Sequence, residues 1–457
     1  MKLTLIGGAG VRVPLMVEGL IRWQDETYID QLVLYDSNAE KLSIIGELVK
    51  HIVSNEKNPF QVKLTTDLRE AVQGADFIYT AIRSGGEEGR VIDERVALKH
   101  GVIGQETTGA GGFSMALRTI PAMLEIAEVI EDEAPGAWVI NFTNPSGLIT
   151  EALQMYTKLK VIGICDAPSS MKIGIAQYLN QKEEDVYINY FGLNHLGWVN
   201  KVLVNGTNQM EFIINNYEDF IEVYPHMKCF SNQLISSLNL LPNEYLFYYY
   251  YQNQAVLNMS DSTNTRGEQI AELNRALLEQ LIENKGDIKK SLCIYKQVMN
   301  ERNSTYMTAE TGGKENKTLG DMESEGYEGL AMSILSSIVN NKKKELILNV
   351  MNNGVIPELK AEDIIEVTCL LDNNGPKPLA VGEVPSSVKG LLVTIKQYER
   401  LTIEAAIEGN VEKAIIALTI HPLVNSYTIA RNVVNDYLIQ HKEYLPQFDD
   451  LGEKANV

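Results

Sequence analysis

Short apolar segments alternate with amphipathic ones along the first third of the chain. Residues 2–6 (KLTLI) and 31–36 (QLVLYD) have the character of buried strands, and residues 11–23 and 39–54 carry apolar positions at helical spacing. The alternation continues with expected strands at 62–65, 75–82, 137–143 and 160–166 and with expected helices at 67–72, 117–132 and 145–157. Strands and helices joined in this order by short connections predict a parallel, doubly wound sheet.

The pattern changes near Tyr187. Residues 187–206 alternate between faces in the manner of an antiparallel strand pair, and residues 210–300 predict helices rich in Leu, Asn and Tyr. Two segments at the end of the chain, 388–409 and 411–423, predict a long helical tail. The polar, Gly-containing stretch 312–326 predicts a mobile loop.

These two sequence patterns predict an α/β protein with two domains. Residues 1–168 are expected to form a Rossmann-like domain with a doubly wound parallel sheet, and residues 169–457 a mixed α+β, largely helical domain. Because no Pro/Ser-rich linker separates them, we expect the two domains to pack tightly.

Composition narrows the class of protein. The formal net charge of −20 and the pI near 4.9 argue against nucleic acid or an anionic membrane as a standing partner. No apolar run approaches the roughly 20 residues that span a bilayer, and the N-terminal residues read as a strand rather than a signal peptide. Four scattered cysteines suit a reducing compartment, so a cytoplasmic location is expected.

A glycine-rich turn follows the first expected strand. Gly7, Gly8 and Gly10 stand between that strand and a helix, where glycine lets the backbone approach a pyrophosphate. Asp36 ends the second expected strand, and a carboxylate there accepts the ribose hydroxyls and disfavours a 2′-phosphate. The turn therefore predicts NAD, although Val13 occupies the third glycine position. A tight strand–helix turn without a ligand is the structural alternative.

Further polar residues follow expected strands. Cys165 ends one strand and His195 lies thirty residues later; a thiolate with an imidazole suits Mn²⁺, Fe²⁺, Co²⁺ or Ni²⁺, with substrate oxygens completing the shell. A buried small thiol and a satisfied core histidine are the alternative. Asn141 and Asn144 stand at another strand end, where they would contact a nicotinamide ribose or sugar hydroxyls, or make ordinary turns.

The segment 83–119 is expected to be a functional loop because of its length and glycine content. It carries Arg83 and Arg90, and arginine is suited to bidentate contact with phosphate. A flexible, solvated crossover is the alternative for this segment.

The motifs of the chain, taken together, resemble glycoside hydrolase family 4, whose members depend on NAD and a divalent metal. The matching segments run in order from one end of the chain to the other. They are GGAGVRVP at 7–14, RSGGEEGR at 83–90, GVIGQETTGAGGFSMALRTIP at 101–121, NFTNPSG at 141–147, GICDAP at 163–168, YFGLNHLGW at 190–198, EYLFYYY at 244–250, YERLTIEAAIEG at 398–409 and ALTIHPL at 417–423.

The resemblance implies a lactate/malate dehydrogenase-like fold and a role for each matching residue. It makes Cys165 and His195 ligands of Mn²⁺ or another divalent metal, Tyr245 the base that removes the C2 proton, and Asp166 a leaving-group acid. It also makes Gly7, Gly8, Gly10 and Asp36 contacts of NAD, with Asn141 beside the cofactor. Arg83, Arg90 and Arg266 become contacts of the sugar phosphate, and Asn144 of the sugar hydroxyls.

Within the family, GQETTGAGG, YFGLNHL and the tyrosine run are most similar to 6-phospho-β-glucosidases. The implied partner is a phosphorylated disaccharide or glucoside, and the implied assembly a homodimer or homotetramer. Many β-specific relatives carry Asn at the position of Asp166, so an α-linked substrate stays open, as does a galactoside or uronide. A 2-hydroxyacid dehydrogenase that uses His195 and Arg118, and a non-catalytic NAD-binding module, remain the other readings.

Overall fold

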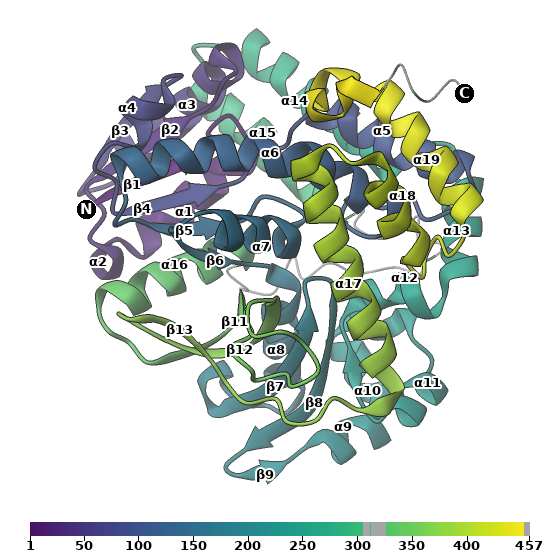
Figure 1. The fold of residues 1–457 in the computed structure, drawn as a ribbon. Helices are drawn as coiled ribbons and strands as arrows, with labels where there is room; N and C mark the ends of the chain where they lie inside the picture. The colour runs from purple at the N-terminus through teal and green to yellow at the C-terminus, as the bar shows by residue number, and fades with distance from the viewer. Residues whose placement is uncertain (305–310, 312–325, 452–457) are drawn as a thin grey trace.

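The computed structural model describes residues 1–304, 311 and 326–451. The loop expected at 312–326 lies outside these residues, apart from Gly326, which begins a helix. The chain is built around one long twisted sheet and a smaller antiparallel sheet, with helices on both faces of the long one (Figure 1).

Six parallel strands form the N-terminal part of the long sheet. They are β1 (Lys2–Ile6), β2 (Gln31–Tyr35), β3 (Gln61–Thr65), β4 (Phe77–Thr80), β5 (Trp138–Asn141) and β6 (Lys160–Gly163). Their order, β6-β5-β4-β1-β2-β3, reverses direction between β1 and β4. This is the doubly wound order of dinucleotide-binding folds, in which ligands bind outside the carboxyl ends of the strands at the reversal. The predicted parallel, doubly wound sheet is confirmed.

Helices cover the two faces of this sheet because right-handed crossovers run in opposite directions from the reversal point. The helices that follow β1 and β2 pack against each other on one face, and those that follow β4 and β5 pack against each other on the opposite face. The bounds are α1 (Val13–Arg22), α2 (Gln24–Thr27), α3 (Ala39–Ser54), α4 (Leu68–Val72), α5 (Gly86–Lys99), α6 (Gly109–Glu133), α7 (Ser146–Tyr156) and α8 (Asp166–Tyr178).

The expectation of a long loop at 83–119 is wrong. Helices α5 and α6 occupy most of it, and only residues 100–108 connect them. Three of the glycines that suggested a loop, those at 109, 111 and 112, stand in the first turn of α6, where they are buried. A Cβ on Gly111 would lie 2.1 Å from the backbone oxygen of Gln105, and one on Gly112 2.4 Å from that of Thr107. The glycine content therefore serves close approach of the connecting segment to the helix.

Three strands from the C-terminal half extend the long sheet. They are β11 (Lys344–Met351), β12 (Ile364–Asp372) and β13 (Gly375–Pro378), which run antiparallel to one another. β11 pairs with β6 through Asn349 and Gly163, so the sheet has nine strands in the order β13-β12-β11-β6-β5-β4-β1-β2-β3. The predicted domain boundary at residue 168 stays a prediction.

The remaining elements surround the parallel strands in Figure 1, with the antiparallel hairpin below them, the helical tail at the right and the helices of residues 266–304 at the top. The expected antiparallel pair is present as β7 (Val186–Leu193) and β8 (Leu196–Val204), and the expected helical tail as α17 (Ser386–Glu408) and α18 (Val411–Ile420). The other elements are η1 (Glu183–Asp185), β9 (Thr207–Asn208), α9 (Met210–Asn215), α10 (Tyr217–Val223), η2 (Pro225–Cys229), α11 (Asn232–Leu238), β10 (Leu241–Pro242), η3 (Glu244–Leu246), α12 (Phe247–Tyr250), α13 (Gln252–Asp261), α14 (Arg266–Glu283), α15 (Ile288–Ser304), α16 (Gly326–Val339), α19 (Tyr427–Gln440), η5 (Lys442–Tyr444) and η6 (Pro446–Leu451).

A single large apolar core runs through both halves of the chain. It joins Leu5 and Ile140 of the parallel strands to Trp198 of the hairpin and Leu392 of the helical tail. Within the described residues, no helix is both long enough and apolar enough to span a membrane.

Candidate active site

Cys165 and His195 lie side by side at the carboxyl edge of the sheet. Cys165 follows β6 and is the residue before α8, and His195 stands in the turn between β7 and β8. The Cys165 Sγ and the His195 Nε2 are 3.4 Å apart, and both side chains are buried. His195 has a backbone φ of +62°, a conformation that is uncommon for a residue of this size and that aims its ring at Cys165. The fold thus brings together the two residues predicted to share a metal.

The imidazole of His195 is held on two further sides. The Tyr245 ring lies on it with the centroids 3.6 Å apart and an angle of 3° between the planes. Tyr245 belongs to η3, where the Asn243 Oδ1 accepts a hydrogen bond from its backbone N–H at 3.0 Å. The Thr107 Oγ1 lies 2.8 Å from the His195 Nδ1. The predicted base is therefore in contact with a predicted metal ligand.

Burial sets the protonation of this pair. It lowers the pKa of His195 to about 3, against the smaller opposing effect of the Glu106 carboxylate, so the imidazole is neutral near pH 7. Burial also raises the pKa of the Cys165 thiol well above its usual value, with help from the carboxylates of Glu366 and Asp166. A divalent cation between the two would reverse the second effect, because it stabilises the thiolate.

The donor set fits such a cation. A neutral imidazole nitrogen and a thiol sulfur face each other, and both atom types ligate transition metals. Within the part of the chain that the structure describes, no group of three His, Cys, Asp or Glu side chains is arranged to hold a metal ion. Of the described residues, Cys165 and His195 would thus hold the metal, and oxygens of a bound molecule or of water suit the rest of its shell.

Asp166 begins α8, next to Cys165, and its side chain is partly exposed. Asn144 follows β5 and is also partly exposed. Three residues further on, the Cα of Gly147 packs so close to Asn194 that a Cβ would lie 3.2 Å from the Asn194 Cβ. The segment of Asn144 thus borders the turn that carries His195.

Asn141 is placed differently from Asn144. Its side chain is fully buried, and its Nδ2 donates to the Thr150 Oγ1 at 3.0 Å. Its Oδ1 accepts from the Thr80 Oγ1 at 3.0 Å and from the backbone N–H of Thr143 at 3.1 Å. The amide of Asn141 therefore binds the ends of β4 and β5 together.

The glycine turn after β1 has the geometry of a dinucleotide site. Gly7 has a φ of +98°, and a Cβ on it would lie 2.3 Å from the backbone oxygen of Ala81. A Cβ on Gly8 would lie 2.8 Å from the Leu34 Cβ. Only glycine fits both positions, which keeps the strand-to-helix turn tight, with the N–H groups of Gly7 and Gly8 both donating to the Tyr35 backbone oxygen, at 3.0 and 2.7 Å. The Asp36 Oδ2 accepts from the Ala9 N–H at 3.0 Å, so Asp36 and the turn of Gly10 are adjacent.

Three arginines gather around one carboxylate, and a fourth lies beside one of them. Glu106 forms ion pairs with Arg83, at 3.3 Å, and with the Nη1 of Arg90. Burial alone would raise the pKa of Glu106, but the guanidinium groups of Arg83, Arg90 and Arg302 lower it to about 2. Burial and the neighbouring arginines, Arg12 first, lower the pKa of Arg302 to about 10. Positive charge therefore exceeds negative charge in this cluster, which favours an anionic ligand.

Arg266 reaches the same region. It begins α14, and its Nη2 donates to the backbone oxygen of Arg302 at 2.8 Å. The Nε of Arg90 donates to the Glu94 Oε1 at 2.7 Å, and the Glu94 Oε2 accepts from the Gly267 N–H at 2.6 Å. Glu94 thus ties α5 to the start of α14. The predicted phosphate contacts Arg83, Arg90 and Arg266 all lie in or beside the arginine cluster.

Arg118 cannot bind a substrate carboxylate, as the dehydrogenase reading requires. It is fully buried, and its Nη1 and Nη2 form a fork with Asp93 at 2.8 and 2.5 Å. Its Nε donates to the backbone oxygen of Ser84 at 2.8 Å. This pairing holds the loop after β4 in place and leaves the guanidinium occupied, so the dehydrogenase assignment of Arg118 is wrong.

Several residues of the site escaped sequence reasoning. Gln105, Glu106 and Thr107 stood inside a quoted motif but were given no role, and Arg302 lies in a polar helix without a motif. Glu366 is an acid among the apolar residues of strand β12, and that contrast is the available signal. It accepts hydrogen bonds from Asn194 at 3.1 Å and from Tyr190 at 3.0 Å, and so supports the turn of His195 from below.

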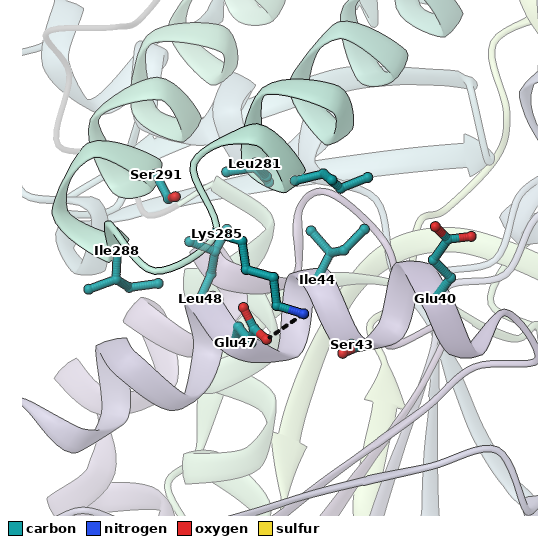
Figure 2. Close-up of a pocket in the computed structure, with 10 residues that line it drawn as sticks. Glu40, Ser43, Ile44, Glu47, Leu48, Leu281, Lys285, Ile288 and Ser291 are labelled. Carbon is teal, nitrogen blue, oxygen red and sulfur yellow. Dashed lines mark ion pairs between the residues drawn. The ribbon is translucent and has the colours of Figure 1, made fainter.

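A cavity of about 330 Å³ lies elsewhere, between α3 and the α14–α15 hairpin (Figure 2). Apolar side chains, including Ile44, Leu48 and Ile288, line it together with the Lys285–Glu47 ion pair at 3.7 Å. Cys165, His195 and Tyr245 are not among its lining residues. The site is therefore defined by its chemistry and not by this cavity.

Comparisons with known proteins agree with the geometry. A family model described as family 4 glycosyl hydrolase matches residues 2–181, and that of the corresponding C-terminal domain matches residues 190–424. A probable 6-phospho-β-glucosidase of Bacillus subtilis, strain 168, is 37% identical over 459 residues, which cover 98% of each chain.

Solved structures are similar along the whole chain. The 6-phospho-β-glucosidase of Thermotoga maritima, solved with NAD and glucose-6-phosphate, has a TM-score of 0.84 at 30% identity and covers 97% of this chain and 99% of its own. A 6-phospho-α-glucosidase from gut microorganisms, solved with NAD and Mn²⁺, has a TM-score of 0.82 at 28% identity, with the same coverage. A malate dehydrogenase of Plasmodium falciparum is 15% identical with a TM-score of 0.52, covering 89% of this chain and 98% of its own. That likeness is one of fold alone, and it confirms the predicted fold class.

Proposed function

The chain belongs to the family 4 glycosyl hydrolases, and from this premise we propose that it hydrolyses 6-phospho-β-glucosides with the help of NAD and a divalent metal. The observation that carries the proposal is the arrangement of three residues from distant parts of the chain. Cys165 lies 3.4 Å from His195, and the Tyr245 ring lies on the His195 ring. Two metal-ligand types and a potential base in contact are what an oxidation–elimination reaction requires.

Mn²⁺ or a similar metal would be held by the Cys165 Sγ and the His195 Nε2. Relatives of this chain have been solved with NAD and Mn²⁺ and with NAD and glucose-6-phosphate, which supports both cofactors here. NAD would lie over Gly7, Gly8 and Gly10. The carboxylate of Asp36 at the end of β2 favours NAD over a cofactor with a 2′-phosphate.

The arginine cluster would bind the 6-phosphate of the sugar. Arg83, Arg90 and Arg302 surround Glu106, and Arg266 is hydrogen-bonded to the backbone of Arg302. A dianionic phosphate suits such a group of planar guanidinium donors better than one carboxylate does. Asn144, next to the turn of His195, would hold sugar hydroxyls.

When held by the glycine turn, NAD would supply reversible hydride transfer at C3 of the sugar, and a metal held by Cys165 and His195 would supply positive charge beside the sugar oxygens. The C2 proton is acidic once C3 is a ketone, and Tyr245 would remove it. Asp166, next to Cys165 and partly exposed, would donate a proton to the glycosidic oxygen as that bond breaks. Water then adds to the unsaturated sugar, and the net reaction is hydrolysis.

A 6-phospho-α-glucosidase is the second candidate. The specific observation that favours it is Asp166, an acid next to a metal ligand, in a chain that is also 28% identical to a 6-phospho-α-glucosidase solved with NAD and Mn²⁺. The B. subtilis relative, at 37% identity, favours the β-anomer. A galactoside or uronide substrate would be a further variant of the same chemistry.

The test is release of p-nitrophenol from the 6-phosphorylated β-glucoside with NAD⁺, Mn²⁺ and a thiol reductant present. We expect activity that disappears when NAD⁺ or the metal is omitted and that is confined to the phosphorylated β-substrate. Activity on the α-linked or the unphosphorylated analogue alone would reassign the substrate and keep the chemistry. No turnover of any of these glycosides, with NAD⁺ still bound, would overturn the proposed function.

A further inference from the structure

The hydroxyl of Thr107 stands between two polar partners. Its Oγ1 lies 2.8 Å from the His195 Nδ1 and 3.0 Å from the Gln105 Oε1. The backbone N–H of Thr107 also donates to the Gln105 Oε1, at 2.7 Å. Since a backbone N–H can only donate, the Gln105 atom at this position is the carbonyl oxygen and not the amide nitrogen.

This geometry decides where the protons lie. A threonine hydroxyl has one proton, and the contact between two oxygen atoms, Thr107 Oγ1 and Gln105 Oε1, requires that proton between them. The oxygen of Thr107 then has only lone pairs to offer to His195. The His195 Nδ1 must therefore carry the imidazole proton and donate it to Thr107, which leaves the lone pair on Nε2, the nitrogen that faces the Cys165 sulfur at 3.4 Å.

The segment that carries Thr107 is fixed to the protein on two sides. A β-bridge between Gly104 and Gly109 closes it, and the glycines at 111 and 112 let the backbone of Gln105 and Thr107 rest directly on α6. Between the two, Glu106 is paired with arginines of the cluster. The contacts of the neighbouring residues thus fix the backbone of Thr107. The position of its hydroxyl therefore does not depend on the side-chain rotamer alone.

We propose that Thr107, oriented by Gln105, is a positioning residue that fixes the tautomer of His195 so that its Nε2 is always ready to bind the metal. The proposal rests on the proposed function, because it assumes a metal on Cys165 and His195. A partner on the second ring nitrogen fixes ring orientation and basicity at histidine metal sites generally. It also gives a role to two polar residues of the motif GQETTGAGG, Gln105 and Thr107, and the glycines at 111 and 112 let their backbone rest on α6.

The test measures Mn²⁺ affinity of the full-length protein without substrate, from the electron paramagnetic resonance signal of free Mn²⁺. Replacement of a partner of this kind weakens metal binding about 10- to 100-fold, and we expect a rise of that size in the Kd of Thr107→Val. Thr107→Ser keeps the hydroxyl and is expected to bind as the wild type does. Gln105→Met is expected to weaken binding, because the hydroxyl proton is then free to turn toward His195. Gln105→Glu keeps the acceptor and should bind normally.

Thr108→Val is the matched control. Thr108 is the next residue, it is buried whereas Thr107 is partly exposed, and its Oγ1 has no hydrogen-bond partner among the described residues. Its replacement should leave the Kd of Mn²⁺ unchanged, and NAD⁺ affinity should be unchanged in every variant. Equal Mn²⁺ affinity of the wild type and Thr107→Val, with Cys165→Ala binding none, would overturn the role of Thr107 alone. If the wild type binds no Mn²⁺, or Cys165→Ala binds it equally well, the proposed metal site is itself wrong and the role of Thr107 falls with it.

Discussion

The rings of His195 and Tyr245 lie parallel, with their centroids 3.6 Å apart and an angle of 3° between their planes. Isolated aromatic rings prefer an offset or an edge-to-face arrangement. The surroundings must therefore impose an overlap as full as this one. Thr107 holds the imidazole at one edge, and Asn243 holds the backbone of Tyr245. Each ring is thus positioned by its own neighbours, and we expect the stack to persist when tyrosine is replaced by phenylalanine.

Tyr245→Phe should therefore separate catalysis from metal binding. The variant keeps the ring on His195 and loses only the proposed base, and a well-placed acid or base typically contributes about 10²–10⁴-fold to a rate. We expect kcat on the 6-phosphorylated β-glucoside to fall by about that factor, with the Kd of Mn²⁺ within about twofold of the wild type. A kcat close to that of the wild type would show that another group removes the C2 proton.

Removal of the metal should abolish turnover and leave the fold intact. Cys165 and His195 are buried in a continuous core, so a chelator is expected to remove the ion without unfolding the chain. Activity should return on addition of Mn²⁺ to wild-type protein and not to Cys165→Ser. Circular dichroism before and after chelation checks the fold, and full activity of the chelated protein with NAD⁺ alone would contradict the metal requirement.

Arg302→Met tests the arginine cluster. Arg302 lies near Arg12, Arg83, Arg90 and Glu106, and a charged hydrogen bond lost from such a site costs about 1.5–3 kcal/mol, or roughly 10- to 100-fold in affinity. We expect KM for the phosphorylated substrate to rise by about that factor, with kcat much less affected.

Arg275→Met on the outer side of α14 is the control, because Arg275 is exposed and its loss should leave KM unchanged. Arg302→Lys keeps the charge without the planar fork and should fall between the two. An unchanged KM in Arg302→Met would remove Arg302 from the phosphate site.

The parallel half of the fold was predictable because its signals are local. Each strand is a short apolar run, each helix has its own periodicity, and the polar residues at strand ends, such as Cys165, mark the edge where ligands bind. The pairing of β11 with β6 joins Asn349 to Gly163 across nearly two hundred residues, and no local pattern reports such a contact. For the same reason the sequence predicted the hairpin that carries His195, but not that strand β12 of the long sheet packs against it.

The sequence predicts those residues of the site whose chemical type indicates their role. It does not predict residues whose role depends only on where they lie in the fold. A thiol and an imidazole suggest a metal by themselves. Thr107 and Gln105 do not, because their role depends on a 2.8 Å contact with a residue 88 positions away. The glycines of α6 were misread as a loop, since glycine content does not distinguish a flexible segment from close backbone packing.

Glu366 should make the stability of the metal-free protein depend on pH. Burial raises its pKa to about 7, although Asn194, Asn349 and Tyr190 donate hydrogen bonds to it. A carboxyl whose folded-state pKa is raised stabilises the fold below its unfolded-state pKa, and this contribution is lost as the pH rises through about 7. Glu366→Gln mimics the protonated acid at every pH. The free energy of unfolding of the wild type minus that of Glu366→Gln should therefore fall by about 2.5 kcal/mol between about pH 5 and about pH 8.5. Urea titrations at the two pH values measure it, and a difference that does not change with pH would contradict the assignment.

Asp166→Asn should distinguish a leaving-group acid from a residue that only borders the metal. An acid that protonates the glycosidic oxygen matters most when the leaving group is a poor one, such as the sugar alcohol of a disaccharide, and little when it is the acidic p-nitrophenol. We expect kcat/KM to fall about 10²–10⁴-fold on a 6-phosphorylated disaccharide and by less than about tenfold on the p-nitrophenyl substrate. The pair of substrates serves as the internal control, because a damaged metal site would slow both reactions equally, and the Kd of Mn²⁺ should stay that of the wild type. An equal loss on both substrates would therefore assign Asp166 to the metal environment. A large loss confined to the α-linked disaccharide, with the β-linked one unaffected, would make the α-anomer the substrate for which this carboxyl acts as the acid.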